Sequence, residues 1–340
     1  MKSHATGSVA TGGAVPHCVL LSTGGTIASR IDPSTGLAMP VSSAKDLLTT
    51  LPDLQNRLTI DMEDIARIPS PHIGPTEWQK LHARIVSLFA NPDVSGVVVS
   101  HGTGLLEETA WFLDVTIPNG KPVVIVGAQR NSSEPDSDGP RNLLNALQVC
   151  ASPEARDLGV LVVQNQHIHA ARDVHKIHTF DVEAFSSGEW GYLGHVVDGR
   201  VYFNRHPAHR LHIPYSGQEL PRVDVIPMYA GASGSLLKAA VADGAKGLVV
   251  QAVGSGHVNP SFASAIGELI QQGVPVVVTT RVQRGGTRVC YGFAGASRRL
   301  LDDGAVLAGE LSAWKARIVL MLAMGSADFS PQRLRRQLGT

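Results

Sequence analysis

The chain has 340 residues, and its 29 Lys and Arg residues balance 29 Asp and Glu residues, so the formal net charge is zero. This balance argues against nucleic acid as the main partner, because binding to phosphate is driven by an excess of cations. At about 150 residues per domain, the length predicts about two domains. No apolar stretch reaches the roughly 20 residues that span a bilayer, so we expect a soluble protein with no membrane partner.

The N-terminal end and the cysteines indicate the compartment. Residues 1–16 are rich in Gly, Ala and Ser and lack the apolar region of a signal peptide, so we expect a disordered N-terminus (1–16) on a cytoplasmic protein. Cys18, Cys150 and Cys290 are odd in number and far apart, which predicts neither a disulfide framework nor a thiolate zinc site.

Short apolar runs alternate along the chain with segments of helical periodicity. The runs are rich in β-branched residues without polar alternation, which is typical of strands buried on both faces. They cover residues 19–21, 96–100, 122–127, 159–163, 223–227, 247–252 and 274–280, and helical patterns cover 76–88, 105–113, 141–150, 234–242, 261–272 and 312–324. The alternation predicts an α/β fold with a doubly wound, mostly parallel sheet.

A stretch with little periodicity divides the chain. Residues 203–221 hold three prolines and three histidines, and we interpret most of this stretch as a linker. The predicted organisation is a larger N-terminal domain (17–205), a linker (206–221) and a smaller C-terminal α/β domain (222–340).

Small polar residues follow several of the predicted strands. Thr23-Gly24-Gly25-Thr26 comes after the first run, and His101-Gly102-Thr103-Gly104 comes after the second. In open α/β sheets, ligands bind outside the carboxyl ends of the strands, so Thr26 and Thr103 are candidates for one shared site. The alternative is that Thr and Gly only form turns and helix caps here.

Motifs for other chemistries are missing or incomplete. The sequence holds no P-loop, no G-x-G-x-x-G after a strand and no G-x-S-x-G elbow, so it favours neither a nucleotide site nor a serine triad. His167, His169, His175 and His178 lie close together without an established zinc-ligand spacing. We therefore expect no metal and interpret this segment as polar and solvent-facing.

A hydroxyl nucleophile with a lysine base remains. A threonine hydroxyl is a weak nucleophile until a neighbouring base takes its proton, and a desolvated lysine with a lowered pKa can do this. Lys176 follows a predicted strand, in Arg172-Asp173-Val174-His175-Lys176. Its alternative role is that of an ordinary surface cation.

Six groups of residues, spread over most of the chain, form one set of sequence motifs. They are Thr23-Gly24-Gly25-Thr26-Ile27-Ala28, His101-Gly102-Thr103 with Glu107-Glu108-Thr109-Ala110, Gly127-Ala128-Gln129-Arg130, Asp138-Gly139-Pro140 with Asn142-Leu143, Arg172-Asp173-Val174 with Lys176, and Lys315-Ala316-Arg317. As a set, over about residues 17–326, they resemble the signature motifs of the bacterial asparaginase/glutaminase family. The resemblance implies a homotetramer built from intimate dimers, no cofactor, and threonine-dependent hydrolysis of a small linear carboxamide.

By position, the resemblance also implies roles for single residues. Thr26 matches the primary nucleophile, and Thr103 and Lys176 match the second threonine and its paired lysine. Ala128 matches the residue whose carbonyl holds the scissile amide nitrogen. The predicted substrate-binding set is completed by Gly25, Ser70, Pro71, Gly102 and Gly104.

The sequence departs from the family pattern where the family binds the α-ammonium group of its substrate. The family's aspartate and glutamine read Gly104 and Pro71 here, although Ser70 is kept, and the glutamate donated by a neighbouring subunit falls at Gly292. The loop at 29–41 lacks the family's tyrosine, and the Asn-Gly-Asn turn reads Ser255-Gly256-His257. An ammonium group stripped of water without carboxylate partners is strongly disfavoured.

These losses predict a roomier, less polar pocket and an amidohydrolase for an amide other than free L-asparagine, such as an N-substituted one. Two alternatives stay open: an L-asparaginase/glutaminase with compensating groups elsewhere, and a catalytically inactive ligand-binding member of the fold. The missing aspartate also predicts a lowered pKa for Lys176, unless a nearby acid such as Glu107 supplies the charge.

Overall fold

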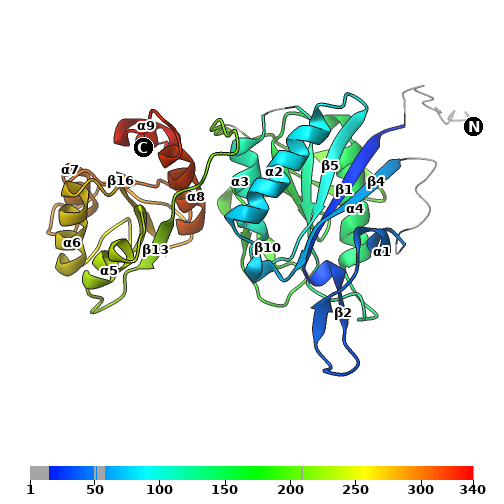
Figure 1. Ribbon diagram of the computed structural model, residues 1–340, viewed down its shortest axis with the longest axis horizontal. Helices are drawn as coiled ribbons and strands as arrows, with labels where there is room; N and C mark the ends of the chain where they lie inside the picture. The colour runs from blue at the N-terminus through cyan, green and yellow to red at the C-terminus, as the bar shows by residue number, and fades with distance from the viewer. Residues whose placement is uncertain (1–14, 50, 52–57, 119, 208–209, 340) are drawn as a thin grey trace, which may run out of the picture.

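The computed structural model describes residues 15–49, 51, 58–118, 120–207 and 210–339. They form two α/β domains side by side: a larger N-terminal domain, drawn blue to green in Figure 1, and a smaller C-terminal domain, drawn yellow-green to red. Of the predicted disordered segment (1–16) and linker (206–221), residues 1–14 and 208–209 lie outside the described residues. The residue boundaries of the two domains stay a prediction.

The N-terminal sheet has the strand order β12-β11-β8-β7-β6-β5-β1-β4. Its strands from β4 to β7 in this order run parallel, and β8, β11 and β12 are antiparallel to their neighbours. The bounds are β1 (His17–Gly24), β4 (Thr59–Ile68), β5 (Val94–Ser100), β6 (Val123–Val126), β7 (Val160–Gln164), β8 (His167–Ala170), β11 (Gly194–Val197) and β12 (Arg200–Phe203).

The central strands are buried because helices cover both faces of this sheet. Val19 and Leu21 of β1 face one core, which contains residues of α2 (Pro75–Phe89) and α3 (Leu106–Thr116). Cys18 and Leu20 face the other core, with α1 (Ala44–Leu48) and α4 (Gly139–Ala151). Strands covered in this way read as continuous apolar runs, which is why the sequence reveals them.

The C-terminal sheet is parallel throughout, in the order β13-β14-β15-β16. One face packs on α5, α6 and α7, and the other on α8, which also contacts α3 of the N-terminal domain. One core therefore runs through both domains. Figure 1 shows α8 between the C-terminal sheet and the N-terminal domain. The bounds are β13 (Val223–Pro227), β14 (Gly247–Ala252), β15 (Val276–Thr280), β16 (Val306–Leu307), α5 (Ser235–Ala242), α6 (Pro260–Gln271), α7 (Ser297–Asp302), α8 (Ala313–Met324) and α9 (Pro331–Leu338).

Every predicted run is a strand and every predicted helical segment is a helix, with ends that shift by up to three residues. The sequence analysis did not predict β4, α9 and most of the short elements. They include the hairpins β2 (Ser29–Ile31) with β3 (Ala38–Pro40) and β9 (His175–Lys176) with β10 (Phe185–Ser186), and the 3₁₀ turns η1 (Thr26–Ala28), η2 (Ser70–His72), η3 (Pro153–Ala155) and η4 (Gly188–Trp190). Within the described ranges, no helix is both long and apolar enough to cross a membrane.

The sheet changes direction at β1. The chain runs from β1 to β4 on one side and then returns to β5 on the other side of β1. The carboxyl ends of β1 and β5 are therefore neighbours, with Ser22 paired to Ser100. Such a switch point is where open α/β sheets bind ligands, and Thr26 and Thr103 both follow it.

We expect Gly25→Ala to destabilise the fold more than Gly36→Ala. Both glycines have a positive φ, but a Cβ atom on Gly25 would lie 2.2 Å from Gly102 Cα, whereas one on Gly36 would meet no heavy atom within 4 Å. Gly36→Ala should cost only the left-handed backbone, about 1 kcal/mol, and Gly25→Ala must also separate two loops. Urea unfolding of both variants measures the difference, and equal losses would contradict the tight contact.

Candidate functional site

Three backbone segments meet where β1 and β5 end. Gly25 and Gly102 are in contact, and a Cβ atom on Gly102 would lie 2.5 Å from Ser70 Cβ and 3.0 Å from Gly25 Cα. Only glycines allow this approach, because any side chain would push the loops apart. The contact holds the loop of Thr26, the loop of Thr103 and η2 with Ser70 together.

Thr103 and Lys176 lie within hydrogen-bonding distance of each other. Lys176 Nζ is 2.7 Å from Thr103 Oγ1 and 2.9 Å from Gln129 Oε1. Thr103 is buried and Lys176 is half-buried. The second strand of the β9–β10 hairpin fixes the lysine backbone, since Lys176 pairs with Phe185. The sequence analysis did not assign a role to Gln129, although it lies in one of the quoted motifs.

Burial lowers the pKa of Lys176 below its ordinary value of 10.5. The expected lowering is therefore present, and its cause is desolvation. Glu107 does not act as the substitute acid, because its carboxylate pairs with His175 Nδ1 at 2.8 Å and lies 4.0 Å from Lys315 Nζ. Besides Thr103, the amine of Lys176 therefore hydrogen-bonds the neutral amide of Gln129.

His101 fixes the peptide that precedes Thr103. It is fully buried, with Nδ1 2.7 Å from Gly102 O and Nε2 2.9 Å from Thr109 Oγ1. Trp78 Nε1 donates to the same Thr109 oxygen, so the threonine hydroxyl is free to donate to His101 Nε2. Burial lowers the pKa of His101 to about 4, and the neutral ring then donates through Nδ1 to the Gly102 carbonyl.

Asp138 and Asn142 fix the loop that carries Ala128 and Gln129. Asp138 accepts hydrogen bonds from the backbone N–H groups of Gln129 and Arg130, at 2.9 to 3.1 Å. Asn142 Nδ2 donates to Gly127 O at 3.1 Å and to Asp138 Oδ2 at 2.9 Å. Gln129 Nε2 donates to Thr179 O at 3.2 Å, which turns Oε1 toward Lys176.

The space beside Gly104 is smaller than the sequence analysis predicts. Ser70 Oγ accepts a hydrogen bond from Leu105 N at 2.8 Å. It would lie 2.8 Å from a Cβ atom on Gly104, so the serine occupies part of the room that the missing side chain leaves. Gly104 itself is exposed, as is Pro71 next to Ser70.

The structure gathers most of the predicted site residues. Ser70, Gly102, Gly25, Gly104, Thr103 and Lys176 are joined by the contacts above. Buried Ala128 lies near η1, because a Cβ atom on Gly139 would lie 3.5 Å from Ala128 Cβ and 3.3 Å from Ile27 Cγ1. Thr26 begins η1 and is partly exposed. The catalytic and binding roles of these residues stay predictions.

The interpretation of the four histidines as solvent-facing is wrong for His169. This side chain is 1% exposed and hydrogen-bonds Ser187 Oγ at 2.9 Å, and burial lowers its pKa to about 3. His167 stacks on Tyr192 with ring centroids 3.8 Å apart. Tertiary packing of β8 on β11 causes this burial, which a local polarity pattern does not show. Within the part of the chain that the structure describes, no three His, Cys, Asp or Glu residues are grouped to hold a metal ion.

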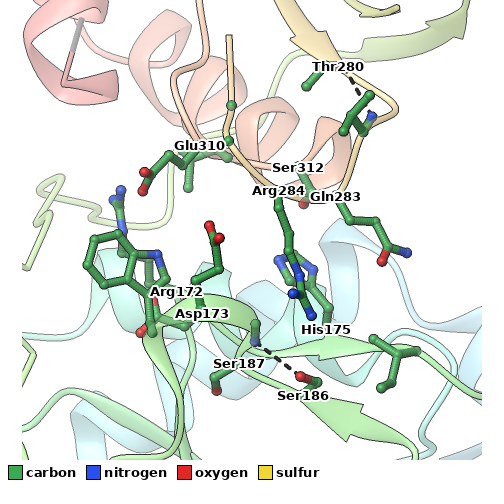
Figure 2. Close-up of a pocket in the computed structure, with 18 of the residues that line it drawn as sticks. Arg172, Asp173, His175, Ser186, Ser187, Thr280, Gln283, Arg284, Glu310 and Ser312 are labelled. Carbon is green, nitrogen blue, oxygen red and sulfur yellow. Dashed lines mark hydrogen bonds between the residues drawn. The ribbon is translucent and has the colours of Figure 1, made fainter. Parts of the chain in front are cut away.

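A cavity of about 240 Å³ lies between the two domains. Its lining includes Arg172, His175 and Lys176 from the N-terminal domain and Arg284 and Glu310 from the C-terminal domain. Figure 2 shows Arg284 pointing across it toward His175. Neither threonine lines this cavity, so it adjoins the Thr103–Lys176 pair only through the lysine.

Comparison with known proteins decides the family. The model of the asparaginase N-terminal domain matches residues 17–209, and that of the glutaminase/asparaginase C-terminal domain matches residues 222–338. The chain belongs to the asparaginase/glutaminase family. It is accordingly a hydrolase that acts on amides, and the motifs quoted from the sequence are those of its family.

Three named proteins show how far the similarity of this asparaginase-family chain extends. It is 35% identical to "L-asparaginase" of Bacillus licheniformis (90% of this chain, 95% of the relative). It is 34% identical to "L-asparaginase 2" of Escherichia coli (95% and 92%). A solved structure, "Probable Cytoplasmic L-asparaginase from Campylobacter jejuni", superposes with a TM-score of 0.87 at 35% identity, covering 96% of this chain and 99% of that one.

We expect Gln129→Glu to raise the pKa of Lys176. The substitution places a carboxylate where a neutral oxygen now lies 2.9 Å from Nζ, and a nearby negative charge favours the ammonium form. Less neutral amine is then present at pH 7, so kcat/KM should fall. The pH range over which kcat/KM rises should shift to higher pH. The control Gln129→Met removes the acceptor without adding charge and should leave that pH range low. Superimposable profiles for Gln129→Glu and wild type would contradict a role of Lys176 as base.

Proposed function

We propose that this chain hydrolyses the side-chain amide of L-asparagine to aspartate and ammonia. The observation that carries the proposal is the buried Thr103 hydroxyl at 2.7 Å from the amine of Lys176. The names of relatives that match at least nine-tenths of the chain support this substrate, because they are called L-asparaginase. They lend no support to the expectation of a different amide.

The Thr103–Lys176 pair supplies the proton acceptor in this proposal. A neutral Nζ keeps an N–H for Gln129 Oε1 and accepts the hydroxyl proton of Thr103 with its lone pair. Thr26 is the nucleophile implied by the family pattern: its Oγ bonds to the amide carbon, and its hydroxyl proton passes through the Thr103–Lys176 pair to the amide nitrogen. The C–N bond then breaks, ammonia leaves, and water cleaves the resulting ester. The lowered pKa of Lys176 supports the role, since it increases the fraction of neutral amine.

An amide without an α-ammonium group is a second candidate substrate. Gly104 favours it, because Asp at this position in the family pattern would supply the carboxylate for that ammonium. Among the described residues other than Gly104 and its chain neighbours, only Ser70 Oγ and Cβ lie within 4 Å of where a Cβ atom on Gly104 would stand, and no carboxylate does. A buried ammonium without such a partner is disfavoured.

A comparison of L-asparagine with succinamic acid separates the two substrates, because succinamic acid lacks only the α-amino group. If L-asparagine is the substrate, its kcat/KM exceeds that of succinamic acid by at least about 10-fold, equivalent to about 1.4 kcal/mol. The reverse order would support the second candidate. If the wild type hydrolyses neither L-asparagine nor any other small carboxamide, the proposed function is wrong.

Thr26→Ala and Thr103→Ala assign the activity to this site, since each should abolish it in a folded protein.

Gly104→Asp tests whether residue 104 faces the α-ammonium group of the substrate. The new carboxylate should raise the preference for L-asparagine over succinamic acid, because it pairs with the α-ammonium group. Gly104→Ala is the matched control, since its Cβ meets Ser70 Oγ in the same way without a charge. An equal preference in both variants would show that residue 104 does not face the ammonium group.

Location and assembly are further proposals. We propose a cytoplasmic protein, which is supported by the name of the Campylobacter jejuni structure, although a Haemophilus influenzae relative of 35% identity is named as periplasmic. We also propose the homotetramer built from intimate dimers that the resemblance implies, with a small-molecule amide as the partner and no cofactor.

A further inference from the structure

Lys315 is a charged side chain in an apolar helix. It lies on α8 of the C-terminal domain, between the two domains, and its side chain is 0% exposed. Its Nζ donates hydrogen bonds to Arg172 O at 2.8 Å and to Val174 O at 2.6 Å, across the domain boundary. Burying an ammonium group is costly unless its hydrogen bonds are satisfied. The buried ammonium group of Lys315 therefore holds the carbonyl groups of Arg172 and Val174 in place.

Both carbonyls belong to the segment that leads directly into β9. Val174 is two residues before Lys176, and His175 between them is fixed by Glu107 Oε2 at 2.8 Å. The Glu107 carboxylate also lies 4.0 Å from Lys315 Nζ. Buried Lys315 and Glu107, together with half-buried His175, therefore hold the backbone on the N-terminal side of Lys176.

Lys315 loses its proton more readily than an ordinary lysine, although nearby carboxylates favour its charged form. Burial lowers its pKa to about 8, while Glu107, Asp173 and Asp114 favour the charged form and Arg172 opposes it. Since the other buried residues of α8 are apolar or small, and burying a charge is costly, the two hydrogen bonds of Lys315 point to a role beyond packing.

We infer that Lys315 is a positioning residue through which the C-terminal domain fixes Lys176 against Thr103. This inference rests on the proposed function, in which Lys176 is the base. A displacement of about 1 Å in a catalytic group costs on the order of 100-fold in rate, so two hydrogen bonds that fix the approach to β9 act on turnover without touching the substrate.

The test compares Lys315→Met with Arg317→Met. Arg317 lies on the same helix and is also largely buried, but it donates to Val223 O at 2.8 Å and lies 3.9 Å from Glu108. Both variants remove a cation from the domain boundary, and only the first releases the carbonyls of Arg172 and Val174. The readouts are kcat and KM on the best amide, the pH profile, and hydrogen–deuterium exchange of the peptide around residues 174–178, with β7 as the internal reference.

We expect Lys315→Met to lower kcat by at least about 10-fold with KM changed by less than about 2-fold, the pattern of a misplaced catalytic group. Exchange at 174–178 should quicken while β7 stays protected, and Arg317→Met should show neither effect at a similar loss in Tm. Equal kcat and exchange in the two variants would overturn the inference. If Lys315→Met does not fold, Lys315→Leu, which also removes both hydrogen bonds, takes its place with the same readouts.

The two proposals fail in different ways. If the wild type turns over no amide, the proposed function falls, and the exchange experiment alone decides the positioning role. Faster exchange at 174–178 in the Lys315 variant then supports it, and unchanged exchange overturns it. If the wild type is active and the variant keeps its kcat, only the positioning role falls.

Discussion

The hydrogen bond between Lys176 and Thr103 is the interaction around which the rest of the structure is arranged. Its two residues come from different parts of the N-terminal domain: Thr103 follows β5 of the large sheet, and Lys176 lies in β9 of the separate β9–β10 hairpin. Each is held by separate groups: neutral His101 fixes the peptide before Thr103, and Gln129 holds the amine of Lys176. The glycine contact at the switch point brings the Thr26 loop to the same place.

The partners of this pair are neutral, and that sets its chemistry. A carboxylate beside Lys176 would stabilise the ammonium form and make it a worse base at neutral pH. Here the acid that is close in sequence, Glu107, is used by His175 and Lys315 instead. Two groups of residues therefore act on Lys176. Gln129 orients its amine without adding a negative charge, and Lys315, Glu107 and His175 hold the backbone of the segment that leads into β9. An Asp at position 104, as in the family pattern, would favour both the ammonium form of Lys176 and a substrate that carries an α-ammonium group, so the proposed mechanism couples base strength to substrate choice at this position.

Much of the fold follows from the sequence because the central strands are covered on both faces. Their runs of Val, Ile and Leu leave a continuous apolar signal, and the threonines after them are placed at the switch point by sheet topology. The strand β4 is different: its residues are half-buried or exposed, and 59–68 read Thr-Ile-Asp-Met-Glu-Asp-Ile-Ala-Arg-Ile, without an apolar run. The two-residue β9 is too short for any periodicity, although it carries Lys176.

The supporting residues of the site were harder to predict, since their roles arise from contacts distant in the chain. Gln129 meets Lys176 over 47 residues, and Lys315 reaches Val174 over 141. Both lie in motifs quoted from the sequence. The single lysine in the mostly apolar segment 313–324 is a sequence feature from which a buried, hydrogen-bonded ammonium group could have been predicted. The burial of His169 leaves no such signal, because it depends on how β8, β11 and Tyr192 pack.

A direct titration of Lys176 tests the central claim most closely. Lysine side chains labelled with ¹³C at Cε report protonation by NMR, and the Lys176→Met variant assigns the resonance. We expect a titration midpoint below the ordinary lysine pKa of 10.5, because the side chain is half-buried beside neutral partners. A midpoint at or above 10.5 would show that Lys176 stays an ammonium ion at neutral pH and does not act as the base for Thr103.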